Sequence, residues 1–254
     1  MISNDDGVQA KGLHHLIDCI NEMNIPADIV AVAPQGHCSG MSSAISVDKP
    51  LRIVRCADYH GAQIYYVTGT PVDCVKLGLH AVMPRKPDLM LSGINHGSNA
   101  GNSLIYSGTM GAAMEACMIG IPAIGYSLLS HDPDADFSQA TPFIKAITRT
   151  IIENGLPDGI CLNVNIPAKC TPQGIKVTKG AAGRWTEEYQ KYDDPHGRPF
   201  YYLTGNYINE EPNNAGADMY WLDRKWVTVT PVHPDQSALG EIPALASLLD
   251  GPLK

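Results

Sequence analysis

The sequence lacks several features by which whole classes of protein are recognised, and the first of these is positive charge. Lysine and arginine total 18 against 26 aspartates and glutamates, so the formal net charge is −8. No basic stripe runs along the chain, and we therefore expect no nucleic acid polymer as a partner. A small anionic substrate remains compatible with this acidity, provided that a cation lies between it and the protein.

Signals for membrane insertion, secretion and disulfide frameworks are also missing. No apolar run reaches the roughly 20 residues of a membrane-spanning helix, and no secretory signal is visible. The seven cysteines show no Cys-x-x-Cys spacing, and Cys19, Cys74 and Cys117 fall in apolar helical patterns. An odd, unpatterned set of cysteines indicates reduced thiols. These observations predict a cytoplasmic protein that does not contact membranes.

The chain also has no Gly-x-Gly-x-x-Gly fingerprint after its first predicted strand. It has the acidic turn Ser-Asn-Asp-Asp-Gly at 3–7 instead, where the pyrophosphate of a dinucleotide would meet two negative charges. The residues before Asn4 are fewer than the roughly 4–6 of an ordinary buried strand. We therefore expect the native chain to begin upstream of Met1.

What the chain does contain is a regular alternation of strands and helices. With 254 residues, 44% of them hydrophobic, it can form one large core, or a core and an appendage. Periodicity predicts helices over 11–24, 71–83, 109–120 and 141–154, and strands over 28–34, 64–68, 88–94, 122–128 and 159–166. Several of these strands are apolar throughout. The pattern predicts a Rossmann-like α/β fold, with a mostly parallel sheet and helices on both faces.

The composition changes near Gly174, where the pattern becomes strand-like and aromatic. We interpret this part as hairpins that protrude and pack against another subunit, and the alternative is a solvent-exposed loop region. A last helix is expected over about 238–249. The predicted organisation is a single domain over 1–254, divided into an α/β core with the active site at 1–170, a hairpin arm at 171–235 and a C-terminal helical segment at 236–254.

Two aspartates follow the first strand directly. Asp5 and Asp6 should therefore lie at the carboxyl end of the sheet, in a surface loop, where open α/β folds bind ligands. Adjacent carboxylates repel each other, and a divalent cation would relieve that repulsion. The alternative is an acidic first turn of the following helix, because carboxylates favour that position.

Neutral oxygen donors follow two other strands. Ser39 and Gly40 come after the second strand, and the loop Gly-Ile-Asn-His-Gly-Ser-Asn occupies 93–99. Their hydroxyl and amide oxygens could coordinate a hard ion, with Asn95 the preferred ligand and an ordinary cap or turn the alternative for Ser39. Oxygen-only ligands favour magnesium or manganese over zinc. His96 is either a general acid or base or a polar loop histidine.

The segment Tyr-Ser-Gly-Thr at 106–109 precedes a strongly helical stretch. Unpaired amides at a helix start, with hydroxyls beside them, bind phosphate, and the alternative is an ordinary serine N-cap at Ser107. Together with the carboxylates, this segment predicts a metal-dependent phosphate site at one edge of the sheet. Three other histidines show no zinc pattern and are expected to be solvated: His14, His15 and His131.

In combination these motifs resemble the SurE family, the stationary-phase survival proteins that act as nucleotidases. The resemblance extends over nearly the whole chain. It rests on the segments at 3–7, 39–40, 69–75, 92–99 and 106–109, and also on Leu-Asn-Val-Asn-Ile-Pro at 162–167 and Val-Thr-Val-Thr-Pro at 227–231. One departure is the segment at 35–38, which lacks the arginine common before the Ser-Gly pair in this family.

The resemblance implies a divalent-metal-dependent phosphomonoesterase acting on nucleoside 5′-monophosphates, and also on 3′-monophosphates and short polyphosphate. It implies one magnesium or manganese ion per subunit, bound by Asp5, Asp6, Ser39 and Asn95. It places the substrate phosphate at Asn99 and Ser107, with Gly108 and Thr109 beside them, so that the catalytic set is Asp5, Asp6, Asn99 and Ser107. The arm is implied to serve in homodimers or homotetramers.

Two other functions stay open at this stage. In an aspartyl-phosphate phosphatase, Asp5 would be the covalent nucleophile, although the two aspartates are adjacent rather than alternate. A nucleotide-sensing binding module would use the same loops without turnover. If the protein is a metal-dependent hydrolase, one carboxylate is less engaged with the metal and orients the attacking water. We expect that carboxylate to be Asp6.

Overall fold

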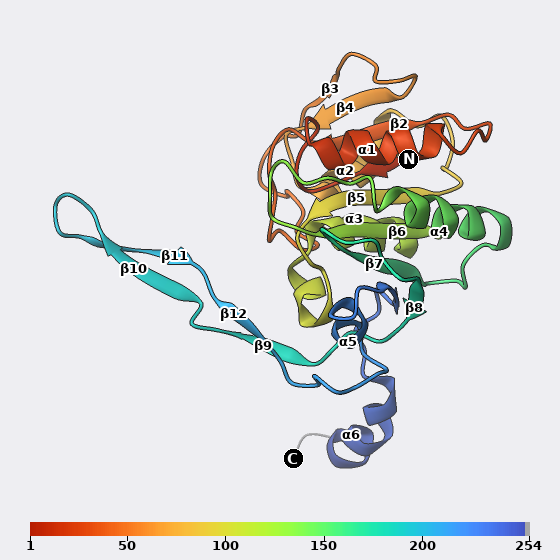
Figure 1. Ribbon diagram of the computed structural model, residues 1–254. Helices are drawn as coiled ribbons and strands as arrows, with labels where there is room; N and C mark the ends of the chain where they lie inside the picture. The colour runs from red at the N-terminus through yellow and green to blue at the C-terminus, as the bar shows by residue number, and fades with distance from the viewer. Residues whose placement is uncertain (252–254) are drawn as a thin grey trace.

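The computed structural model describes residues 1–251, and one nine-stranded sheet forms its centre (Figure 1). The strand order is β3-β4-β2-β1-β5-β6-β7-β13-β8. All neighbours from β4 to β7 run parallel, whereas β3 runs antiparallel to β4 and β13 runs antiparallel to β7 but parallel to β8. The strands are β1 Ile2–Ser3, β2 Val30–Pro34, β3 Ile53–Arg55, β4 Gln63–Val67, β5 Met90–His96, β6 Ala123–Leu129, β7 Cys161–Pro167, β8 Ile175–Val177 and β13 Val227–Val232.

Helices cover both faces of this sheet, as the sequence predicts. On one face, α1 (Lys11–Asn21) and α4 (Thr141–Asn154) bury Leu13, Leu16 and Ile144 against the strands. On the other face, α2 (Pro71–Ala81) and α3 (Gly108–Met118) bury Val75 and Met110. The mostly parallel Rossmann-like architecture is therefore confirmed, with an antiparallel strand added near each edge.

Local sequence signals explain where these helices begin and end. At the start of α2, the Thr70 hydroxyl accepts a hydrogen bond from the Asp73 amide (3.1 Å), and the Asp73 carboxylate accepts one from the Thr70 amide (2.9 Å). This reciprocal capping satisfies two amides that a helix start leaves free. Helix α1 ends at Asn21, three residues before the predicted end, and Asn24 just beyond it has a left-handed φ of 52°.

The first strand is very short but central. Ile2 and Ser3 pair in parallel with β2 on one side and with β5 on the other. The N-terminal ammonium of Met1 also donates to the carbonyl of Leu89 (2.9 Å). Because both neighbours supply hydrogen bonds, two residues suffice to fix the turn that follows.

The arm is present but occupies less of the chain than predicted. It consists of two antiparallel ladders that extend away from the sheet (Figure 1). The ladders are β9 (Gly183–Thr186) with β12 (Asn206–Asn209), and β10 (Tyr189–Asp193) with β11 (Pro199–Leu203). The rest of the predicted arm region at 171–235 belongs to the core, because it supplies β8, β13 and a short helix, α5 (Asp218–Leu222), which sequence patterns did not indicate.

The chain continues past the sheet into a short helical segment. A 3-10 turn at Leu239–Glu241 leads into α6 (Ile242–Leu249), where a helix over about 238–249 was predicted. The apolar side chains of α6 are exposed in the single chain. Residues 252–254 of the predicted C-terminal segment lie outside the described residues. Within residues 1–251, no helix is long and apolar enough to cross a membrane.

Candidate active site

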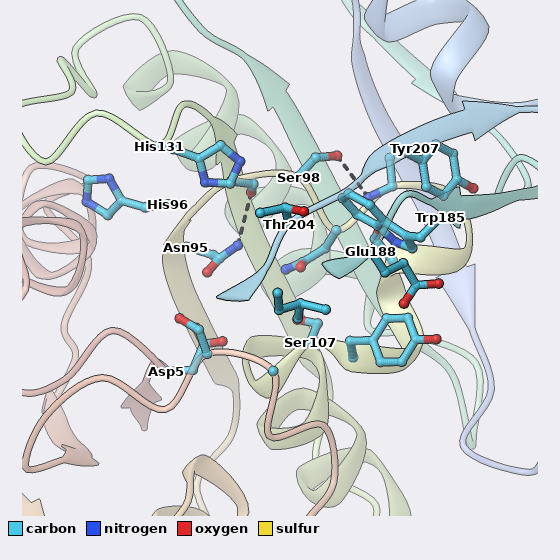
Figure 2. A pocket seen from close by; sticks show the side chains of 18 of the residues that line it. Asp5, Asn95, His96, Ser98, Ser107, His131, Trp185, Glu188, Thr204 and Tyr207 are labelled. Atoms are coloured by element: carbon cyan, nitrogen blue, oxygen red, sulfur yellow. Dashed lines mark hydrogen bonds between the residues drawn. The ribbon is translucent and has the colours of Figure 1, made fainter. Parts of the chain in front are cut away.

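A cavity of about 580 Å³ opens at the carboxyl ends of the parallel strands (Figure 2). The predicted loops meet there: Asp5 follows β1, Ser39 follows β2, and Asn95 and Asn99 lie at and after the end of β5. Ser107 joins them from the start of α3. A second wall, which the sequence did not indicate, comes from the base of the arm and includes Trp185, Glu188, Tyr189, Leu203, Thr204 and Tyr207.

Asp5 is a buried carboxylate on the cavity wall, with 3% of its surface exposed. Burial raises the pKa of Asp5 from 3.8 to about 6, and the negative charge of Asp6 adds to this, whereas a hydrogen bond from the Thr109 hydroxyl opposes it. A carboxylate whose charged form is disfavoured in this way is stabilised by a cation placed beside it.

Asp6 points to a different side of the turn. One of its carboxylate oxygens accepts a hydrogen bond from the His96 amide (3.1 Å), and the other lies 3.5 Å from the His37 ring. Asp6 is not among the described residues that line the cavity. The structure thus brings only one of the two adjacent aspartates to the cavity wall, and direct metal binding by Asp6 stays a prediction.

The turn that carries both aspartates is closed on itself and packed into the protein. The Asn4 side chain donates to the Gly7 carbonyl (2.9 Å) and accepts from the Gly7 amide (3.2 Å). Gly7 has a φ of +104°, and a Cβ there would lie 3.0 Å from the Gly36 Cα. The expectation of a surface loop is wrong, because Asn4 is fully buried and both aspartates are less than a tenth exposed.

The last residues of β5 present Asn95 to the cavity. Its side-chain nitrogen donates to the Gly97 carbonyl (3.0 Å), and its side-chain oxygen lies on the side of Asp5 (Figure 2). Gly97 has a φ of +115°, which favours glycine, and a Cβ there would lie 2.4 Å from the ring of His131. His131 is exposed, as predicted, but it also lines the cavity, which its sequence context did not reveal.

His96 lines the cavity and also packs against a neighbouring ring. It is one of the lining residues, but its ring packs edge-on against Phe137, with centroids 5.2 Å apart. In Figure 2 the ring points away from Asp5. This arrangement favours the interpretation of His96 as a loop histidine that packs locally.

Asn99 is held by a buried polar network on β6 and β7. Its amide donates to the side chain of Asn165 (2.8 Å), its side chain donates to Ser127 (2.7 Å), and its carbonyl accepts from Asn163 (2.7 Å). The side chain of Asn165 in turn donates to that of Asn163 (3.1 Å). Sequence reasoning missed these roles, although two asparagines at alternate positions of an apolar strand share one face of the sheet.

Ser107 caps α3 and lines the cavity at the same time. Its hydroxyl oxygen accepts a hydrogen bond from the Met110 amide (3.0 Å), which leaves the hydroxyl proton for another acceptor. A Cβ on Gly108 would lie 2.9 Å from the Asp5 Cβ, so only glycine lets α3 start this close to Asp5. Thr109 is fully buried beneath Asp5, and phosphate contacts by Gly108 and Thr109 stay predictions.

A further buried carboxylate ties the arm to this site. One oxygen of Asp218 accepts from the Gly101 amide (2.8 Å) and the other from the Ala181 amide (2.9 Å). Gly101 begins a 3-10 helix, η1 (Gly101–Tyr106), which ends immediately before Ser107. No sequence pattern marks Asp218, because its partners lie 117 and 37 residues away along the chain.

The residues around the cavity fit a hard cation better than a zinc site. Asp5, Ser39 and Asn95 supply carboxylate, hydroxyl and amide oxygens around one space, and such donors suit magnesium or manganese. Within residues 1–251, no three histidine, cysteine, aspartate or glutamate side chains form a metal cluster. The described lining also contains no lysine or arginine, and its histidines are His96 and His131.

The sequence of this chain matches the model of one protein family. The family model "Survival protein SurE" matches residues 1–187. The chain belongs to the SurE family. The part that matches includes all the polar loops of the cavity and the first strand of the arm.

Individual SurE proteins are similar over nearly their whole length. The 5'-nucleotidase SurE of Phocaeicola vulgatus is 44% identical over 240 residues, which are 94% of this chain and 92% of that protein. The 5'-nucleotidase SurE of Bacteroides thetaiotaomicron is 41% identical over 96% of this chain and 93% of its own length. The crystal structure of the SurE protein from Aquifex aeolicus matches with a TM-score of 0.82, at 32% identity and 98% coverage of both chains.

Proposed function

We propose that this chain is a divalent-metal-dependent 5′-nucleotidase, a phosphomonoesterase that converts nucleoside 5′-monophosphates to nucleoside and phosphate. Proteins about 40% identical to it over nearly its full length are 5'-nucleotidase SurE proteins. Nucleoside 3′-monophosphates and short polyphosphate are proposed as further substrates. One magnesium or manganese ion per subunit is proposed as the cofactor.

The observation that carries this proposal is the composition of one cavity. A buried carboxylate at Asp5 faces the same space as the helix start at Ser107 and the loop end at Asn99. The described lining residues include no lysine or arginine that could neutralise a phosphate. A cation between Asp5 and the phosphate resolves this conflict, and the neutral donors complete the coordination of both.

In the proposed reaction the protein residues hold and orient the phosphate. Asp5, with Ser39 and Asn95, would hold the cation, which when bound supplies Lewis-acid polarisation of the phosphoryl group and of water. The hydroxyl proton of Ser107 is free to donate to a non-bridging oxygen, since its oxygen already accepts from the Met110 amide. Asn99 is fixed by Asn163 and Asn165 and would contact a second oxygen. Such fixed donors stabilise the charge that develops during transfer.

A phosphate-release panel tests this function directly. Purified protein treated with a chelator should release no phosphate, and added manganese or magnesium should restore release from nucleoside 5′-monophosphates. No release with any metal would leave a binding protein without turnover. Release that survives chelation would contradict the metal requirement, and an acid-stable phosphorylated Asp5 would indicate the covalent aspartyl-phosphate route instead.

Localisation and assembly belong to the proposal as well. All seven cysteines are free thiols, which agrees with a reducing cytoplasm. A homodimer or homotetramer is proposed because the arm carries exposed aromatic side chains far from the sheet, among them Tyr192, Tyr201 and Tyr202. A single domain over 1–254, with its arm and C-terminal helical segment as appendages, remains the proposed organisation.

A further inference from the structure

The cavity wall opposite the polar loops is aromatic, and it comes from the arm of the same chain. Figure 2 shows Trp185, Glu188 and Tyr207 across the cavity from Asp5. Tyr189, at the start of β10, lines the same wall. The cavity therefore has a polar end, which suits a cation and a phosphate, and an aromatic end with a carboxylate.

Hydrogen bonds and a ring contact join this aromatic wall to the phosphate end. The Tyr207 hydroxyl donates to the Ala181 carbonyl (3.4 Å) and accepts from the Asn102 amide (3.2 Å). The Trp185 ring packs edge-on against Tyr207, with centroids 5.5 Å apart and planes at 75°. Because Asn102 lies in η1, which runs directly into Ser107, these contacts connect the aromatic wall to the phosphate end.

The size and the exposure of the aromatic end both call for an organic ligand group. The cavity, at about 580 Å³, lies within the roughly 300–1,000 Å³ typical of pockets for organic ligands. Trp185 is 38% exposed and Tyr189 is 68% exposed. Phosphate gains nothing from such rings, whereas every nucleobase has a flat face that stacks on aromatic side chains.

We infer that the base of the arm is the nucleobase subsite of its own subunit, with Trp185 as the stacking residue. Tyr189 extends the apolar wall, and the Glu188 carboxylate accepts a hydrogen bond from an amino or hydroxyl group of the nucleoside. Glu188 repels phosphate, so it also orients the nucleotide with its phosphate toward Asp5. The inference rests on the proposed nucleotidase function and assigns to the arm base the recognition of the nucleoside part.

Steady-state kinetics of Trp185→Leu on two substrates tests the subsite. With adenosine 5′-monophosphate, KM should rise roughly 5- to 150-fold, which corresponds to the stacking energy of one base, while kcat stays within about threefold. With glycerol phosphate, which has no base, kcat/KM should stay within about twofold. Trp185→Phe should keep most of the affinity, because it preserves a stacking face.

Tyr202→Leu is the matched control, since Tyr202 is an exposed aromatic of the same arm that is not among the lining residues. If Tyr202→Leu reproduces the rise in KM, the effect comes from the arm as a whole and the subsite assignment is wrong. An unchanged KM for the nucleotide in Trp185→Leu, or an equal loss with both substrates, would overturn it as well.

Equilibrium dialysis with adenosine separates this inference from the proposed function. Adenosine has no phosphate, so its binding does not depend on turnover or on a metal. Binding by the wild type that is lost in Trp185→Leu supports the subsite even if no nucleotide is hydrolysed. If the wild type hydrolyses nucleotides but Trp185→Leu binds adenosine as tightly as the wild type does, the nucleotidase function stands and the subsite falls.

Discussion

At the scale of single residues, Asp5 should be necessary for activity because its charge would hold the cation. We predict that Asp5→Asn lowers turnover at least roughly 100-fold, since a neutral amide binds a hard cation much more weakly than a carboxylate. The Thr109 hydroxyl can still donate to the new side chain, so the local fold should survive. Phosphate release measured across manganese concentrations checks this, and near-native activity at saturating manganese would remove Asp5 from the metal site.

The same residue should destabilise the metal-free fold at neutral pH. Burial raises the pKa of Asp5 to about 6, so the folded state holds this proton more tightly than the unfolded state. The stability contributed by protonated Asp5 is present below the unfolded pKa of 3.8 and is lost as the pH rises through about 6. Without metal, Asp5→Asn should therefore raise the free energy of unfolding near pH 8 by at most about 3 kcal/mol, and the Tm should rise with it.

Calorimetry in the presence of a chelator measures this effect, and the gain should shrink as the pH is lowered toward about 4. Asp28→Asn is a suitable control because Asp28 is exposed. An equal Tm for Asp5→Asn and the wild type at both pH values would mean that the buried carboxylate costs the fold nothing.

His96 is the residue for which the sequence leaves two roles open. Its ring packs on Phe137, and its backbone amide, which a substitution keeps, makes the contact with Asp6. We predict that His96→Ala lowers kcat less than about tenfold and leaves the shape of the pH–rate profile unchanged. A loss of about 100-fold with a displaced limb of that profile would instead establish His96 as the general acid or base.

At the scale of one element, the start of α3 combines a structural and a chemical role in Ser107. Loss of the cap alone should lower stability by about 1 kcal/mol, whereas loss of a donor to the phosphate should lower kcat roughly 10- to 1000-fold. We predict both effects for Ser107→Ala.

Thr70→Ala provides the comparison for that prediction, because Thr70 caps α2 in the same manner but does not line the cavity. It should show the loss of stability with nearly full activity. Thermal melts and phosphate release on the two variants separate the two roles, and indistinguishable kinetics would reduce Ser107 to a cap.

At the scale of the whole molecule, the arm projects from the sheet and should contribute to association. Replacement of residues 191–201 by an Asn-Gly turn shortens the β10–β11 hairpin and keeps Tyr189, Leu203 and Thr204 at the cavity. We predict a lower oligomeric state, because exposed aromatic side chains such as Tyr192 and Tyr201 would be removed. Light scattering gives the mass in solution, and a mass per particle that still corresponds to the native assembly would show that this hairpin is not needed for association.

The sequence by itself determined the alternation of strands and helices, and it determined which polar loops meet at the cavity. Helical periodicity located α4 at its observed bounds, and the apolar strands indicated a parallel sheet. Since parallel strands end at one edge, the polar segments after β1, β2 and β5 had to converge. The family motifs were also visible in the residues alone. These features depend on local patterns and on one general property of parallel sheets.

Only the tertiary structure determined where the side chains of the site point and which residues hold them in place. The sequence places Asp5 and Asp6 side by side in one turn, and packing of that turn sends Asp5 to the cavity and Asp6 to the His96 amide. Asn163 and Asp218 hold loops that are 64 and 117 residues away, and no local period encodes such pairs. The arm base became a cavity wall for the same reason, because only the folded sheet brings β9 beside η1, the 3-10 helix that leads into Ser107.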